Sequence, residues 1–551
     1  MRTPRMTPTI LAMTNIRGAA STDDELVRRC RERLAHATAG YRAGEFRSST
    51  EAALEAGELA RKAGRPDLLA EAALIEAGIP DPATAPAVER LCRDALGSIG
   101  AVETALRARL HGQLAIALHH RGRLDEASAE VDRALALASG SGDPVAVAAA
   151  LNARQFAIAG LGHGSELLEL GRRMLDAALA AGSVEIELQA HNWRIEAFFR
   201  LADSVGAADE IDSLDVLAAR TGDSQVRWNA RLARAGLAHA VGRLAEAERL
   251  AREARGILPP AQRPQTEPLF IAQLLLISTD RGLEPPEIGL ARGFVVGGHP
   301  IAVAMTGRYD LEMGDLARAQ AAFEAVRPRL ASVAMDRRGL ATLTAALELA
   351  VAFGDTAVAL DMHARLAPFE PTMIASALGA VGPIAYFLAR AEGLLGRHDE
   401  AVAHAQAAIE MSARGDFGPW LARSRLALAE ALRMRDRSGD VELARRSAIL
   451  AAVTARELGM APVLAGAKAL AARLAPQRRL SKRELEIARL VARGSSNREM
   501  ALSLGLSERT IETHVQNVLT KLGFHARTQI AAWSAMEVID ALGPSGDPDA
   551  T

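Results

Sequence analysis

Four polar side chains near the C-terminal end of the chain recur at intervals that place them on one face of a helix. They are Glu512, Thr513, Gln516 and Asn517. Their carboxylate, hydroxyl and amide groups can hydrogen-bond to base edges in the major groove of double-stranded DNA. The opposite side of the same helix is apolar, with Ile511, Val515, Val518, Leu519 and Leu522. The pattern predicts a helix that packs on one side and contacts bases on the other.

Residues around this helix carry groups that could contact DNA phosphates. The candidates are Asn497, Ser507, Arg509, Thr510, Lys521 and Arg527. Such contacts fix the register of a protein on the duplex without reading its sequence. Two alternatives stay open, because Arg509 could be an ordinary solvated helix charge and Asn497 could make only a contact within the protein. His514 is expected to pack or hydrogen-bond within the domain.

Local sequence patterns divide residues 480–524 into three short helices that would position these side chains. Capping boxes at Ser481–Glu484 and Ser496–Glu499 mark the first two helix starts. Ser507 is expected to cap the third helix, Glu508–Leu522. Each helix is followed by a glycine, namely Gly494, Gly505 and Gly523. This arrangement predicts a helix-turn-helix that places its last helix in a DNA groove.

The same stretch resembles the LuxR-type DNA-binding domain. The resemblance is carried by Leu480-Ser-Lys-Arg-Glu484, Gly494-Ser-Ser-Asn-Arg-Glu-Met-Ala501, Leu506-Ser507, Thr510-Ile511, His514-Val515, Lys521-Leu-Gly523 and Arg527. It implies a four-helix domain that binds paired half-sites as a dimer, with a fourth helix over Arg527–Leu542. It also implies base-reading positions at Glu512, Thr513 and Gln516. Many members have a basic residue at the first of these, where Glu512 could instead accept from cytosine N4.

A short phrase returns through most of the preceding sequence. It consists of a glycine, a charged residue and an alanine five positions after the glycine, and it begins at Gly122, Gly242, Gly314 and Gly396. Weaker copies begin at Gly44, Gly162, Gly206, Gly282 and Gly354, with a faint step near Gly78. The average step is about 39 residues, a period typical of a solenoid of helix hairpins. Each glycine is expected to end the first helix of a hairpin in a tight turn.

These hairpins resemble tetratricopeptide repeats, whose usual period is about 34 residues, so longer helices or loops are expected here. Two helices, Val441–Leu458 and Pro462–Leu474, are predicted between the repeats and the helix-turn-helix. Together with the repeats they resemble the C-terminal portion of the large ATP-binding LuxR-family regulators. The sequence has no phosphate-loop motif, so control by ATP is not carried over.

Two tryptophans, Trp193 and Trp228, precede Gly206 and Gly242 by similar distances, which suggests equivalent places on successive first helices of the hairpins. Both could simply be bulky packing residues that the repeat requires. The alternative is an effector pocket, because polar and aromatic groups gather here. The residues of that possible pocket are His191, Asn192, Trp193, Arg194 and Trp228, with Glu196 beside them.

Composition supports a helical, non-enzymatic protein. Hydrophobic residues make up 49% of the 551 residues and aromatic residues only 3%, and tracts of Ala, Leu, Arg and Glu favour helices over strands. Net charge is −2, so nucleic-acid binding requires a local basic patch. Residues 476–540 contain ten Lys and Arg against seven Asp and Glu. The sequence has no catalytic motif, cofactor motif or metal-ligand spacing, and Cys30 and Cys92 are expected to be buried apolar residues.

The sequence therefore predicts an all-α protein, a tetratricopeptide-like α-solenoid followed by a four-helix LuxR-type domain. The expected divisions are a flexible leader (1–22), helical repeats (23–435), connecting helices (436–475), the helix-turn-helix domain (476–541) and a disordered tail (542–551). The predicted function is a cytoplasmic, sequence-specific transcription regulator, dimeric on DNA, whose repeats sense a small molecule or protein partner. In the alternative, the repeats are a protein-interaction scaffold that the helix-turn-helix localises to DNA. No membrane contact and no cofactor are expected.

Overall fold

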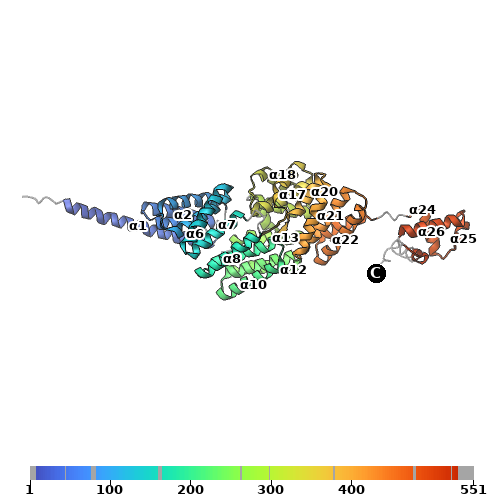
Figure 1. The fold of residues 1–551 in the computed structure, drawn as a ribbon, viewed down its shortest axis with the longest axis horizontal. Helices are drawn as coiled ribbons and strands as arrows, with labels where there is room; N and C mark the ends of the chain where they lie inside the picture. The colour runs from blue at the N-terminus through green and yellow to red at the C-terminus, as the bar shows by residue number, and fades with distance from the viewer. Residues whose placement is uncertain are drawn as a thin grey trace, which may run out of the picture. The chain divides into compact units, whose positions relative to one another are not determined.

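The computed structural model describes residues 8–43, 45–75, 82–158, 164–260, 263–296, 298–376, 379–475, 480–522 and 524–531. The chain forms two compact units, Met1–Ala471 and Ala472–Thr551, and each is described by itself. Both are built almost wholly of helices (Figure 1), as the sequence predicts.

The first unit is a succession of antiparallel helix pairs (Figure 1). Its helices are α1 (Pro8–Ala43), α2 (Phe46–Lys62), α3 (Pro66–Ala73), α4 (Ala85–Ser98), α5 (Thr104–His120), α6 (Leu124–Ser141), α7 (Pro144–Ile158), α8 (Gly164–Ala181), α9 (Val184–Arg200), α10 (Ser204–Thr221), α11 (Ser224–Ala240), α12 (Leu244–Ile257), α13 (Arg263–Arg281), α14 (Ile288–Val296), α15 (Pro300–Glu312), α16 (Leu316–Val326), α17 (Arg337–Phe353), α18 (Thr356–Leu366), α19 (Ile384–Leu394), α20 (His398–Arg414), α21 (Gly418–Arg435), α22 (Asp440–Leu458) and α23 (Ala461–Arg473). Short 3₁₀ turns lie at Pro82–Thr84, Arg327–Ser332 and Ala367–Phe369.

Glycine in the left-handed region joins the two helices of a pair, which confirms the role predicted for the repeated phrase. Gly122, Gly242, Gly314 and Gly396 have φ of 73°, 87°, 82° and 75°. At Gly242 the backbone N–H donates to His239 O at 2.9 Å, and the next N–H donates to Ala238 O at 2.8 Å. These bonds satisfy carbonyls that the end of α11 would otherwise leave unpaired.

The prediction that a copy of the repeated phrase begins at Gly206 is wrong. The turn between α9 and α10 lies at Ala202, which adopts φ of 53°, whereas Gly206 lies inside α10. Asp203 caps that helix by accepting from the Gly206 N–H at 2.8 Å. With this correction the turns at 202, 242 and 282 are spaced by 40 residues. The steps predicted at Gly44, Gly162 and near Gly78 lie outside the described residues.

Late helices of the first unit close against early ones. Arg423 of α21 bonds Asp280 of α13, with Nη2 and Oδ1 separated by 2.8 Å. A Cβ placed on Gly282 would lie 2.8 Å from Pro462 Cδ at the start of α23. These contacts join residues more than 140 positions apart, so the repeats curl back on themselves.

A two-stranded antiparallel hairpin lies inside this curl, in an otherwise helical unit. It is formed by β1 (Met373–Ser376) and β2 (Gly379–Pro383), with Met373 opposite Pro383 and Ser376 opposite Gly379. The hairpin contacts α9 and α11. A Cβ on Gly379 would lie 3.2 Å from the Gly236 backbone, so glycine permits this close approach. One hydrophobic core runs from α9 through the hairpin to α21.

The N-terminal expectation also needs correction, because α1 begins at Pro8, within the predicted flexible leader. Proline fits the first helical position, and no further proline occurs before Pro66 to interrupt the helix. Cys30 and Cys92 are buried, as predicted. Among the helices described here, none is long and apolar enough to cross a membrane. The described residues contain no group of His, Cys, Asp or Glu arranged to hold a metal ion.

Candidate nucleic-acid interface

The second unit contains the three predicted helices, α24 (Lys482–Ala492), α25 (Asn497–Leu504) and α26 (Glu508–Leu522). Both capping boxes are formed. Ser481 Oγ accepts the Glu484 N–H at 3.2 Å, and Glu484 Oε2 accepts the Ser481 N–H at 2.7 Å. The Ser496–Glu499 box has the same two bonds, at 3.3 and 2.7 Å. The starts of α24 and α25 are therefore fixed by interactions within four residues of sequence.

Turns and a small core hold α26 against the other two helices. Gly494 and Gly505 have φ of 83° and 64°, and Ser507 Oγ accepts the Thr510 N–H at 3.2 Å. Gly523, predicted to close α26, lies outside the described residues. The core consists of Ile487, Ala488, Val491, Met500, Ala501, Ile511, Val515, Val518, Leu522 and Ile530. Four of the five apolar positions predicted for α26 are buried in it, and Leu519 is partly buried.

The predicted base-reading residues lie on the exposed side of α26. Glu512, Thr513, Gln516 and Asn517 are all exposed. Thr513 Oγ1 donates to Arg509 O at 3.0 Å. Thr520 continues the same exposed row one turn further along and was missed, although its spacing from Gln516 and Thr513 indicates the same face.

Two of the residues that were predicted to contact phosphates, Asn497 and Arg527, bond to each other within the domain. Arg527 Nη1 donates to Asn497 Oδ1 at 2.7 Å, and its Nη2 donates to the Ser495 carbonyl. These bonds attach the segment after α26 to the beginning of α25. They bring together two residues 30 positions apart that the sequence assigned to the same surface. Residues 527–531 are helical, and the remainder of the predicted fourth helix lies outside the described residues.

Lys521 pairs with a carboxylate of the first capping box. Its Nζ lies 2.7 Å from Glu484 Oε2, with 45% of the lysine side chain exposed but only 5% of the glutamate. Burial acts to raise the pKa of Glu484, but the bonds from Lys521 and Ser481 outweigh it and hold that pKa below its ordinary value. The ion pair therefore links α24 to α26, a role that sequence spacing did not indicate.

The remaining predicted phosphate contacts gather at the start of α26. Ser507 and Thr510 share a hydroxyl hydrogen bond of 2.8 Å, and both they and Arg509 lie in or beside the first turn. Backbone N–H groups at a helix start attract anions, and Arg509 is exposed there.

The sequence did not indicate that Arg483 makes a contact within the domain. Its Nη2 donates to Leu504 O at 2.7 Å and so satisfies a carbonyl at the end of α25. His514 is half-buried within the domain.

In the first unit, polar residues of the predicted effector pocket are already paired with side chains of neighbouring helices. His191 Nδ1 lies 2.6 Å from Glu210 Oε1, and Arg194 Nη2 lies 2.8 Å from Glu210 Oε2. Burial acts to raise the pKa of Glu210, but these two partners outweigh it and hold that pKa below its ordinary value. Asn192 Nδ2 donates to Asn229 Oδ1 at 3.2 Å. The polar groups thus connect α9 to α10 and α11.

The two tryptophans do not occupy equivalent places, which corrects the sequence interpretation. Trp193 lies nine residues before the turn at Ala202, whereas Trp228 lies fourteen before Gly242. Trp193 Nε1 donates to Asn152 Oδ1 of α7 at 2.9 Å, and its ring meets Phe156 edge-on at 5.3 Å. Trp228 packs beside α12 instead, in a cluster with Leu232, Ala254 and Leu258.

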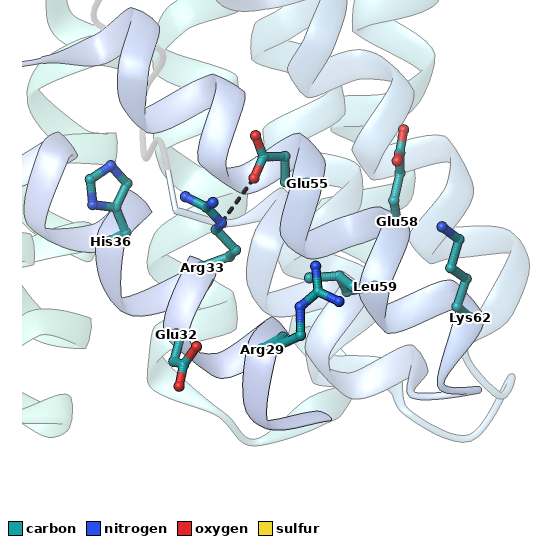
Figure 2. Close-up of a pocket in the computed structure, with 8 residues that line it drawn as sticks. All are labelled: Arg29, Glu32, Arg33, His36, Glu55, Glu58, Leu59 and Lys62. Carbon is teal, nitrogen blue, oxygen red and sulfur yellow. Dashed lines mark ion pairs between the residues drawn. The ribbon is translucent and has the colours of Figure 1, made fainter. Parts of the chain in front are cut away.

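An open groove lies elsewhere in this unit, between α1 and α2, and Figure 2 shows its lining side chains. They are Arg29, Glu32, Arg33, His36, Glu55, Glu58, Leu59 and Lys62. Arg33 crosses it to pair with Glu55, with Nε and Oε2 separated by 2.9 Å. Charges of both signs alternate along the groove, so it has no strong preference for an anion or a cation.

Comparison with known proteins places the second unit in a family. Residues 478–534 match the family described as "Bacterial regulatory proteins, luxR family". Over 59 residues, or 11% of the chain, the sequence is 42% identical to the transcriptional regulatory protein LiaR of Bacillus subtilis and 41% identical to the oxygen regulatory protein NreC of Staphylococcus aureus. The chain spans 28% and 27% of the lengths of these relatives.

The whole chain is also similar to a solved structure titled "Crystal structure of APC/C hetero-tetramer Cut9-Hcn1". The TM-score is 0.46 with 13% sequence identity, and the match covers 95% of this chain and 98% of that chain. The helix pairs of the first unit, with their glycine turns, form a tetratricopeptide-like repeat region independently of this likeness. Residues 478–534 of this chain form a helix-turn-helix domain of the luxR family of bacterial regulatory proteins, carried behind a region of tetratricopeptide-like helical repeats.

Proposed function

We propose that this protein is a DNA-binding transcription regulator that binds paired half-sites as a homodimer and reads base edges with α26. The observation that supports this most is the separation of the two faces of α26. Ile511, Val515 and Val518 are buried in the core of a luxR-family domain, whereas the polar row beginning at Glu512 is exposed. A helix of this kind can enter the major groove without disturbing the fold.

Within the row, the side chains suit different contacts. Gln516 can read adenine through N6 and N7, and Glu512 can accept from cytosine N4. Asn517 and Thr513 lie beside them on the same face. Ser507, Arg509 and Thr510 at the start of α26, with Asn497 at the start of α25 and Arg527 bonded to it, would set the register through phosphates.

Selection of bound sequences from a random DNA pool by the full chain, repeated with Gln516→Ala, tests base reading. The variant should relax preference at one base position, with a loss of about 1–3 kcal/mol for the preferred base. The matched control is Arg489→Ala, an exposed position on α24, which should leave the selected sequence unchanged. Identical preferences for the wild type and Gln516→Ala would contradict base reading by this residue.

We also propose that the repeat unit receives the regulatory signal, from a small molecule or a protein partner. Its curled arrangement supports this. A ligand that binds better to repeats of a different curvature would lower the population of the curled arrangement. Native mass spectrometry of the full chain isolated from its own cells is the test. A co-purifying small molecule would favour a sensor, a stoichiometric protein would favour a recruiting scaffold, and DNA binding that no co-purifying component alters would contradict a regulatory role for the repeats.

A further inference from the structure

The outer side of α22 is unusually apolar for a solvent-facing helix. Five large aliphatic side chains on this helix are 40–51% exposed, namely Val441, Leu443, Ile449, Leu450 and Val453. No other helix in the described part of the chain exposes more than two large aliphatic side chains to this degree or beyond. A concentrated apolar surface of this kind marks an interaction site more often than scattered apolar residues do.

Equivalent helices of other repeats show what the fold itself requires at these positions. The buried side of α22 carries Ala444, Ala448, Ala451 and Ala455, and α12 and α20 bury matching rows of small residues. When the helices are aligned on these rows, the outward positions of α12 carry Glu246, Arg249, Arg252 and Glu253. Those of α20 carry Glu400, Ala403, Gln406 and Ala407. The repeat is therefore stable with a polar or small outer row, and the aliphatic row of α22 serves something other than the packing of its own unit.

The exposed residues of α22 form a continuous seam. Positions 443, 446, 450, 453 and 457 alternate steps of three and four, the spacing at which one helix contacts another along its length. We call Leu443, Ile449, Leu450 and Val453 the outer stripe. Glu442 lies before the stripe and Arg456 after it, and Arg446 lies within it, where its Nε donates to Glu442 Oε1 of the same helix at 3.1 Å.

The charges at the ends of the stripe are complementary to those of a second copy of the same helix. Glu442 precedes Ile449 by seven residues, and Arg456 follows Ile449 by seven. In an antiparallel pair with its two-fold axis at Ile449, each Glu442 lies opposite the Arg456 of the other copy. A two-fold interface must be self-complementary in this way, since the same patch is used on both subunits.

We propose that the outer stripe of α22 is a self-association surface on which two copies of this protein pack their α22 helices antiparallel. A single helix of 19 residues is about 28 Å long, so the contact covers less than the roughly 800 Å² per partner of a standard stable interface. The association is therefore reversible, and paired DNA half-sites would strengthen it by holding two copies together. Only this last point rests on the proposed function.

Sedimentation velocity of the full chain without DNA, across a concentration series, tests the proposal. The wild type should pass from monomer to dimer, and Leu450→Glu should raise the dissociation constant by about tenfold or more because it places a charge in the centre of the seam. Val216→Glu on α10, another exposed aliphatic position, is the matched control and should leave the dimer unchanged. Circular dichroism checks that each variant keeps its helical content.

A charge exchange separates contact between copies from an effect within one helix. Glu442→Arg and Arg456→Glu should each weaken the dimer, because like charges then meet at both ends. The double variant should restore it. The two positions are about 21 Å apart along one helix, so restoration can arise only between copies.

Some results would overturn self-association. They are a wild type that stays monomeric throughout, a dimer that Leu450→Glu leaves intact, or a double variant as weak as either single one. Capture of a different protein by a strictly monomeric wild type would likewise assign the stripe to another partner.

A separate experiment tests the proposed function. It measures binding of the full chain to a random-sequence duplex by fluorescence anisotropy. Loss of this binding in an intact dimer would count against the proposed function and leave the proposed surface standing.

Discussion

The repeat unit and the helix-turn-helix unit use charged and polar side chains in opposite ways. In the repeat unit, Arg423 is 4% exposed and lies between two carboxylates, with Nη2 2.8 Å from Asp280 Oδ1 and Nη1 2.7 Å from Glu312 Oε1. In the second unit, the polar row of α26 is exposed. The difference teaches that buried charges here join distant repeats, whereas exposed polar groups stay available for a ligand.

The largest expected effect comes from removing the buried cation. Arg423→Met would leave Asp280 and Glu312 without their guanidinium partner, and His239, 2.8 Å from Asp280, could compensate for only one of them. Breaking a buried pair in this way costs about 3–5 kcal/mol. Urea unfolding followed by circular dichroism measures the loss. Arg172→Met, which removes two surface ion pairs on α8, with Glu169 and Asp176, should leave the midpoint nearly unchanged. Equal midpoints for both variants would contradict a special role for burial.

The same substitution should have a characteristic pH dependence. Burial acts to raise the pKa of Asp280, but Arg423 and His239 outweigh it and hold that pKa below its ordinary value. A depressed pKa contributes stability that is present above the unfolded pKa and is lost as pH falls. In Arg423→Met the carboxyl could protonate instead, so the stability difference from wild type should shrink between pH 7 and about pH 4. A difference that is constant over this range would contradict the electrostatic explanation.

Two glycines offer a smaller and sharper test of the curl. Gly122 and Gly282 both have positive φ, but only Gly282 faces a distant element, the ring of Pro462. Gly122→Ala should therefore cost only the left-handed backbone strain of about 1–2 kcal/mol. Gly282→Ala should cost about 1–3 kcal/mol more, because the proline ring cannot rotate away from the new methyl group. Equal losses in thermal unfolding would show that the ends of the curl do not meet at this point.

The sequence predicts local features of both units well. Ser481 with Glu484 and the turn at Gly242 involve residues within about four positions, so their types and spacing determine the structure. The bond between Arg423 and Asp280 joins residues 143 positions apart, and no spacing rule relates such a pair. The Ala202 turn was missed for a different reason, since alanine there adopts a conformation that usually indicates glycine.

The smallest effect concerns Lys521, where the two uses of charge meet in one side chain. Its Nζ pairs with buried Glu484, yet the lysine is nearly half exposed, so solvent screening limits the stability cost of Lys521→Met to about 1 kcal/mol. That cost should appear at neutral pH and diminish as pH falls below about 4, because the depressed pKa of Glu484 makes the pair effective only while the carboxylate is ionised. If Lys521 also contacts a phosphate, the variant should weaken binding to all DNA sequences alike and reduce the salt slope by about one. A stability loss without any change in salt slope would assign Lys521 to the domain alone and leave the phosphate surface to the residues at the starts of α25 and α26.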